Sequence, residues 1–319
     1  MGRFLLRRVG LGIVVLWVMT TVVFVMFFVA PHNVARTIAG RQATPDTVAA
    51  VSRRLGLDRP VLQQYGDYLW NLLHGNLGYS FYNSSSVTSL ITQRIPVTAS
   101  LAIGGAILWL ALGVMSGVVA ATRPRTWADR TVTVGALVFY SLPTFLLGLF
   151  FLYFLFFRLH LAGITFFPGS GYVPLTQDPL DWAQHLLLPW FTIALGTAAT
   201  YSRLTRGSLL DVLGEDYIRT ARAKGLRERR VVYRHGLRAA VTPVVTQFGI
   251  DLGTLLGGVI IVENIFGLPG LGQLAVQSVI QQDLPVVIGT VILAAAFVVA
   301  ANIVVDLFYA VLDPRVRAH

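Results

Sequence analysis

The feature that most constrains this chain is a series of apolar stretches, each about 20 residues or longer, with almost no charged side chains. The first runs from Val9 to Ala30, directly after Arg3, Arg7 and Arg8. A helix of roughly 20 residues covers the roughly 30 Å of hydrocarbon in a bilayer. Backbone polar groups in lipid need partners within their own segment, so such stretches adopt helices. We therefore expect an all-α membrane protein.

The composition supports this and excludes other classes. Of 319 residues, 55% are hydrophobic and only 13% charged, outside the balance of a soluble domain. The net charge of +10 does not indicate nucleic-acid binding, because the basic residues lie between apolar stretches and form no aromatic-interleaved surface. The chain has no cysteine, which excludes disulfides and thiol sites. The first apolar stretch is too long for a signal peptide and lacks a cleavage pattern, so we expect it to be retained.

The distribution of basic residues predicts the topology. About six spans are expected, which places both termini on one side of the membrane. Alternate segments hold 18 of the 25 basic residues, and the rich side is cytoplasmic. The predicted spans are Val9–Ala30, Val97–Ala121, Thr131–Phe157, Leu186–Ser202, Val241–Val262 and Pro285–Val305.

The segment from Pro31 to Pro96 is expected outside and has helical signals of its own. Thr44 is suited to cap a helix whose first residue is Pro45, and a second helix is expected around Val61 to Leu72. We therefore divide the chain into residues 1–96, a transmembrane helix with an extracytoplasmic helical segment, and residues 97–319, a membrane domain.

The loop from Arg203 to Arg238 holds ten basic and four acidic residues. These arginines could simply fix the topology and contact anionic lipid heads, each worth about 1 kcal/mol. That explanation does not cover the stretch from Tyr217 to Leu226, in which small residues precede Gly225, a residue suited to end a helix. Small side chains permit close docking on another protein.

This stretch resembles the coupling loop of ABC importer permeases of the dipeptide/oligopeptide/nickel family. Arg234-His235-Gly236-Leu237-Arg238 and Thr242-Pro243 extend the likeness beyond the loop. Other matching stretches, in the same order, are Leu55-Gly56-Leu57-Asp58-Arg59-Pro60, Gly75-Asn76-Leu77-Gly78-Tyr79-Ser80, Glu263-Asn264-Ile265-Phe266-Gly267-Leu268-Pro269-Gly270-Leu271-Gly272 and Leu312-Asp313-Pro314-Arg315.

The resemblance implies a type I ABC importer permease in the bacterial inner membrane, with a coupling loop at about 203–240. It also implies a helix seated in a groove of a cytoplasmic ATPase. In the general importer pattern Glu-Ala-Ala precedes the glycine, whereas this chain has Arg219-Thr220-Ala221, so Glu215 or Asp216 is the alternative source of the carboxylate. The coupling residues implied are Glu215, Asp216, Ala221, Arg222, Ala223, Lys224 and Gly225.

The partners implied are a second homologous permease, two cytoplasmic ATPase subunits or domains, an external solute-binding protein and membrane lipid. The chain has no phosphate-binding loop, so ATP and magnesium are expected on the partner ATPases. No metal site or catalytic residue is expected in this chain.

Two places are candidates for the pathway or its outer gate. Asp251 lies near the middle of an apolar span, where a carboxylate must face a cavity or a bonding partner. It could line the pathway or make a structural contact, and both readings stay open. The resemblance of the stretch after this span to the family's outer loop implies an external gate, and the candidates for it are Glu263, Asn264, Gly267 and Gly270.

The function expected is half of the translocation pathway of an ATP-driven importer of peptides. Dipeptides, oligopeptides and nickel all remain possible substrates within the family. The alternative is a self-contained secondary transporter or channel, in which Asp251 and Glu263 would serve ion coupling or selectivity.

Overall fold

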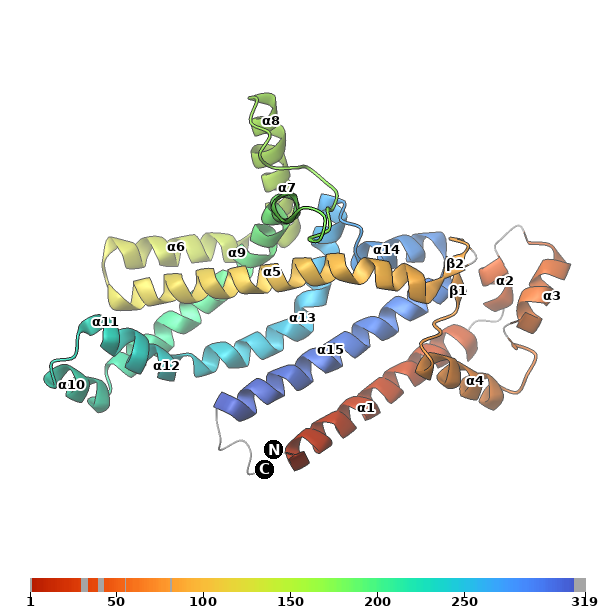
Figure 1. Cartoon of the computed structure of the whole chain (residues 1–319), viewed down its shortest axis with the longest axis horizontal. Coiled ribbons are helices and arrows are strands. Elements are labelled where there is room, and N and C mark those ends of the chain that lie inside the picture. The colour runs from red at the N-terminus through yellow and green to blue at the C-terminus, as the bar shows by residue number, and fades with distance from the viewer. Residues whose placement is uncertain (1, 30–33, 40–42, 55, 81, 313–319) are drawn as a thin grey trace. The chain divides into compact units, whose positions relative to one another are not determined.

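The structure, a computed structural model, describes residues 2–29, 34–39, 43–54, 56–80 and 82–312 (Figure 1). Almost all regular structure in these residues is helical. The exceptions among them are β1 and β2, two short strands that pair antiparallel with Tyr79 opposite Ser86. The predicted all-α class is confirmed.

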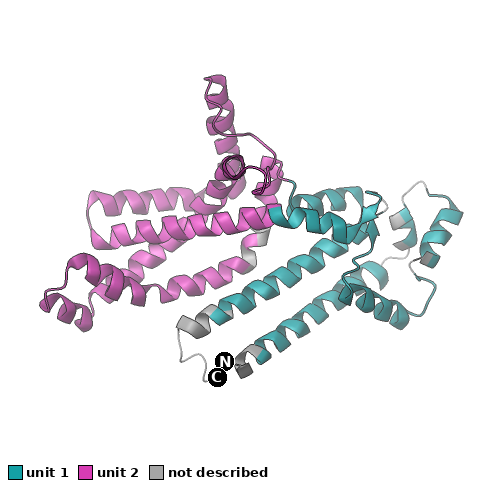
Figure 2. Cartoon of the chain, in the orientation of Figure 1, with its two compact units in different colours: residues 1–96, 269–307 teal, residues 97–268, 308–319 magenta. Residues whose placement is uncertain are grey.

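The chain divides into two compact units, shown in different colours in Figure 2. Unit 1 comprises residues 1–96 and 269–307, and unit 2 comprises residues 97–268 and 308–319. The boundary at residue 96 coincides with the predicted domain boundary, but residues 269–307 group with the N-terminal part. These units reflect how closely the residues pack and do not show that either part folds alone. The division into residues 1–96 and 97–319 therefore stays a prediction.

Unit 1 combines the first and last long helices with the predicted outer segment. In that segment the Thr47 amide donates to Thr44 Oγ1 at 3.3 Å, and Pro45 begins the helix as expected. The elements are α1 (Gly2–Phe24), the π-helical η1 (Val25–Val29), α2 (Val34–Ala39), α3 (Pro45–Arg54), α4 (Val61–Leu73), β1 (Tyr79–Ser80), β2 (Ser85–Ser86), α14 (Leu271–Gln281) and most of α15 (Leu284–Leu312).

Unit 2 contains the long helices that lead to the basic loop. In Figure 1, α10 and α11 lie beyond the last turn of α9, at one end of this unit. Its elements are most of α5 (Val87–Thr122), α6 (Trp127–Ser141), α7 (Thr144–Phe151), η2 (Leu152–Arg158), α8 (Leu159–Leu161), α9 (Pro179–Leu213), α10 (Asp216–Ala223), α11 (Glu228–Arg230), η3 (Val231–Gly236), α12 (Leu237–Ala240) and α13 (Thr242–Phe266).

Glycines on α5 let its backbone approach α9 closely. A Cβ atom at Gly113 would lie 2.4 Å from the Cβ of Tyr201, and one at Gly117 would lie 2.6 Å from the carbonyl oxygen of Ser202. Real side chains do not tolerate such distances, so both positions require glycine. Small residues are the usual means by which membrane helices come together. Trp109 and Tyr201 are completely or almost completely buried in the core beside this contact.

Not all of the six expected spans coincide with one long apolar helix of the described residues. Four helical stretches of the described residues are long and apolar enough to cross a membrane. A fifth is possible if the end of α13, Val259–Phe266, and α14 count as one bent span. The predicted span at Leu186–Ser202 lies within α9, which carries charged residues at both ends and many small residues between. The four stretches are Leu6–Val29, Val87–Thr122, Thr144–Leu161 and Leu284–Val305.

Prolines account for two differences in the helix boundaries. Pro143 separates α6 from α7, so the predicted span Thr131–Phe157 is divided between two helices. Pro96 lies inside α5, which begins at Val87 and not at Val97. Pro189 lies within α9 without ending it.

Candidate coupling segment and intramembrane carboxylates

The predicted coupling segment begins where α9 ends. Glu215 occupies the N-cap of α10, in an extended conformation, and the helix ends at Lys224. Gly225 then takes a left-handed conformation with φ of +74°, and its amide donates to the Arg222 carbonyl at 2.9 Å. A helix of two turns with a glycine stop is the geometry that the sequence predicts.

One face of α10 is fixed to the loop itself. Ile218 is fully buried and Ala221 is 8% exposed, and both pack against Val231 of η3. Ala221 was predicted as a docking residue, but its side chain faces its own chain. The other face is exposed to solvent and carries Tyr217, Arg219, Thr220, Ala223 and Lys224.

Arg222 joins the two ends of this segment. Its Nε and Nη2 donate to the two carboxylate oxygens of Glu228, at 3.1 and 2.8 Å, and its Nη1 lies 3.4 Å from the carbonyl oxygen of Leu213. The hydrogen bonds from Arg222 lower the pKa of Glu228, and Glu228 in turn raises the pKa of Arg222. The guanidinium thus has a partner within the loop, whereas we predicted it for the docking surface.

The two carboxylates at the start of α10 are both exposed. Asp216 lies at the surface and accepts a long hydrogen bond of 3.3 Å from Arg219. Glu215 is exposed at the N-cap, and its side chain makes no cap hydrogen bond. Either carboxylate is placed to meet a partner, so the choice between them remains open.

An ion pair that sequence reasoning missed ties α6 to α9, just before the coupling segment. Arg206 donates from Nε and Nη2 to both oxygens of Asp129, at 2.7 and 2.9 Å, and the Arg125 amide donates to the same carboxylate at 3.0 Å. The Asp129 side chain is 8% exposed. The hydrogen bonds from Arg206, above all, lower the pKa of Asp129 to about 2. The available signal was an aspartate inside a short basic loop.

Asp251 of α13 accepts hydrogen bonds from two neutral side chains. The Tyr201 hydroxyl donates to its Oδ2 at 2.8 Å, and Gln247 Nε2 donates to its Oδ1 at 2.9 Å. The side chain is partly buried. These contacts support a structural role for Asp251. Its role in the pathway stays a prediction.

Glu263 is completely buried at the last turn of the same helix. Thr98 of α5 donates from its hydroxyl to Oε1 at 2.5 Å. A buried carboxylate needs such partners, because burial without them is costly. Glu263 therefore joins α13 to α5, and it does not lie on a surface that a solute reaches in this conformation.

The remaining gate candidates shape the chain around this point. Gly267 ends α13 with φ of +60°, and its amide donates to the Glu263 carbonyl. Asn264 is exposed and donates to the Ile260 carbonyl at 2.8 Å. Gly270 forms the N-cap of α14 and belongs to the other compact unit. Among the described residues, no group of three or more His, Asp or Glu side chains is placed to hold a metal ion.

Residues 113–318 match the protein family described as binding-protein-dependent transport system inner membrane component. That match covers well over half of the chain. The chain belongs to this family. The N-terminal part of such components matches separately, over residues 1–102. The permease is thus a transporter subunit of the inner membrane with several spans, and it is not an enzyme.

Several known permeases are similar along almost the whole length. The chain is 40% identical over 317 residues to a putative peptide transport system permease protein of Brucella abortus. This alignment covers 99% of each chain. It is 37% identical over 318 residues to the glutathione transport system permease protein of Shigella flexneri, and 38% identical over 340 residues to the dipeptide transport system permease protein of Escherichia coli K12, again with 99% of both chains covered.

Proposed function

We propose that this permease forms half of the translocation pathway of an ATP-driven importer of short peptides. The relatives named for peptide, dipeptide and glutathione transport support this substrate class. Sequence similarity over 99% of this chain and 99% of each of those relatives is the observation that carries the proposal.

Coupling to the ATPases would use the exposed face of α10. That face has two small residues, Thr220 and Ala223, beside the glycine stop, so another protein can approach the helix closely. Its opposite face is fixed by Ile218, so a push on α10 is passed to the loop beneath it and not absorbed locally.

The path from α10 into the membrane would run along α9. This helix is continuous for 35 residues and ends two residues before the Glu215 N-cap. Arg206 connects it to α6 through Asp129. Movement of the loop would therefore reach two helices of unit 2 at once. In this proposal both termini are cytoplasmic, and ATP and magnesium are bound by the partner subunits.

The test compares two glycines in the same local setting. Gly225 and Gly75 each follow the C-cap of a helix, with φ of +74° and +71°, and neither has an atom within 4 Å of an added Cβ. We expect Gly225→Arg to abolish co-purification of the ATPases and ATP-dependent peptide uptake in proteoliposomes that contain all subunits. Gly75→Arg should cost a similar backbone strain but leave ATPase co-purification intact.

Two results would count against the proposal. Equal loss of ATPase co-purification in both variants would show that strain, and not a docking surface, is responsible. Peptide uptake by the chain alone, without ATPases, would favour a self-contained transporter or channel. Binding of peptides to the cognate external protein would then decide the substrate class.

A further inference from the structure

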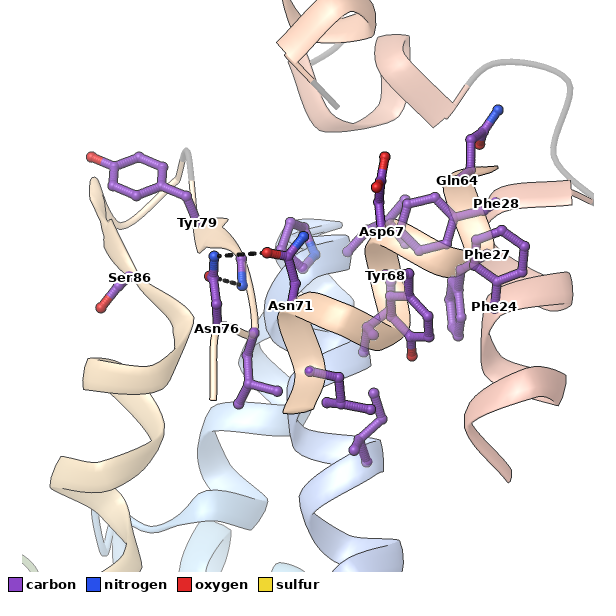
Figure 3. Close-up of a pocket in the computed structure, with 17 residues that line it drawn as sticks. Phe24, Phe27, Phe28, Gln64, Asp67, Tyr68, Asn71, Asn76, Tyr79 and Ser86 are labelled. Carbon is purple, nitrogen blue, oxygen red and sulfur yellow. Dashed lines mark hydrogen bonds between the residues drawn. The ribbon is translucent and has the colours of Figure 1, made fainter. Parts of the chain in front are cut away.

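Unit 1 contains a cavity of about 430 Å³ that none of the proposed importer functions uses (Figure 3). Figure 3 shows three phenylalanines on one wall and α4 across from them. The residues of α15 that close it are Leu284, Pro285, Ile288 and Ile292. The cavity therefore has an apolar floor.

The cavity lies at the ends of two helices that can cross a membrane. Phe24, Phe27 and Phe28 are among the last residues of the stretch Leu6–Val29, and the α15 residues begin the stretch Leu284–Val305. This places the cavity at a boundary between lipid and water, whichever side of the membrane that is.

The helix α4 carries the marks of an interfacial helix. Leu62, Trp70 and Leu73 are 84%, 64% and 81% exposed and lie on one face, given the spacing of 3.6 residues per turn. Tryptophan with exposed leucines on a short amphipathic helix is typical of segments that lie in the headgroup region. A helix of this kind would place lipid against the outer face of the cavity wall.

Tyr68 brings a hydrogen-bond donor to the lining of this cavity. Its hydroxyl is buried and makes no hydrogen bond with the described residues, although it lines the cavity. Phe24 and Phe28 contact its ring, with centroids 5.4 and 5.8 Å away, and fix its direction. Burial raises the pKa of Tyr68 to about 12, so the hydroxyl keeps its proton. A carbonyl oxygen of a ligand would complete its bonding.

The cavity lining includes the carboxylate of Asp67, whose ion-pair partner Arg59 lies next to it. The neutral amides of Gln64, Asn71 and Asn76 also line the cavity. Arg59 Nη1 lies 2.9 Å from Asp67 Oδ2, and both side chains are more than half exposed. An exposed ion pair of this kind is weak and readily exchanges its partners. Its two charges match a head that carries a phosphate and an ammonium group.

We propose that this cavity binds one zwitterionic phospholipid with a primary ammonium head. The ammonium meets Asp67 and the phosphate meets Arg59. An ester carbonyl accepts from Tyr68, and an acyl chain covers the apolar floor. Phosphatidylethanolamine fits these groups better than phosphatidylcholine, since a trimethylammonium group donates no hydrogen bond to the carboxylate. A soluble peptide would also offer ammonium and carbonyl groups, but it does not explain the position of the cavity.

The test measures lipid retained by the full-length chain, purified in mild detergent, with native mass spectrometry. Phosphatidylethanolamine, phosphatidylcholine and phosphatidylglycerol with identical acyl chains are titrated separately. We expect saturable binding of one molecule and the tightest binding for phosphatidylethanolamine. Tyr68→Phe should weaken binding of all three lipids about fivefold, because the ester carbonyl is common to them. The melting temperature should not fall, because the hydroxyl has no partner in the protein.

Tyr65→Phe is the matched control, one turn earlier on α4. Its hydroxyl is bonded to Thr21 Oγ1 at 2.6 Å, so this variant should lower the melting temperature and leave lipid binding unchanged. Asp67→Asn should weaken phosphatidylethanolamine about threefold and remove its advantage over phosphatidylcholine.

Three results would overturn the proposal. The first is the absence of saturable lipid binding. The second is unchanged lipid binding by Tyr68→Phe. The third is a peptide, added to the same sample, that occupies the site in preference to lipid and loses affinity in Tyr68→Phe.

Discussion

The coupling segment and the two carboxylates of α13 differ in how the structure presents them, although both are predicted from the sequence as functional. The face of α10 that carries Ala223 and Lys224 is exposed, while its base is buried. Glu263 is completely buried and bonded to Thr98, and Asp251 is bonded to Tyr201. The first region offers a surface to another protein. The second holds helices together.

This difference separates two kinds of functional residue. A residue on the α10 surface acts by contact, so its substitution should change assembly more than stability. A residue such as Glu263 acts through the arrangement of helices, so its substitution should change stability first. Each of the following variants tests one side of that distinction.

The largest effect is expected from Gly225→Val. A β-branched residue at φ of +74° is strained by about 1–3 kcal/mol, so the chain should leave this conformation and misplace Lys224. We expect ATP-dependent uptake to fall about tenfold or more. Gly225→Asn is the control, because asparagine tolerates left-handed conformations. Equal uptake in the two variants would show that the conformation of this turn does not matter.

Glu263→Ala should have the largest effect on stability. The change leaves a cavity and removes the hydrogen bond to Thr98 in the core of unit 2, so the free energy of unfolding should fall by about 3 kcal/mol. Unfolding in mixed detergent micelles measures it. Asn264→Ala is the control, because Asn264 is exposed and bonds only within its own helix turn among the contacts described. If the folded fraction of Glu263→Ala also failed to bind the ATPases, the separation of the two regions would not hold.

Much of this arrangement follows from local sequence signals. The Thr44 cap, the Gly225 stop and the all-α class all follow from propensity, capping and apolar length. These signals act within a few residues of one another, so a single sequence contains them.

Other features depend on contacts between distant segments. The bond of Arg206 to Asp129 joins residues 77 positions apart, and the bond of Glu263 to Thr98 joins residues 165 apart. Helical periodicity places a residue on a face but does not identify the facing helix. For the same reason the sequence did not predict the burial of Ala221. A small side chain is equally suited to contact a partner protein and to pack within its own chain.

Asp129→Asn tests the connection between α6 and α9, with an effect expected to be smaller than that of Glu263→Ala because Arg206 is 34% exposed. The folded pKa of Asp129 is about 2, below the ordinary value of 3.8. A depressed pKa stabilises the folded state fully above the ordinary value, and this stabilisation is lost as the pH falls through the folded value. The melting temperatures of wild type and variant should therefore converge between about pH 4 and pH 2. Parallel curves would contradict the ion pair.

The smallest effect is expected from Glu228→Gln. Both partners in its pair with Arg222 are substantially exposed, so water and salt screen them, and the free energy of unfolding should fall by less than about 1 kcal/mol. Asp211→Asn, which removes an exposed carboxylate near the end of α9, is the control for the change in charge. The informative measurement is ATPase binding by Glu228→Gln. If Arg222 serves only to close the loop, ATPase binding should fall slightly in low salt and equal that of the control in high salt. If Arg222 contacts the ATPase, release from Glu228 frees its guanidinium and binding should increase, which would return Arg222 to the docking surface.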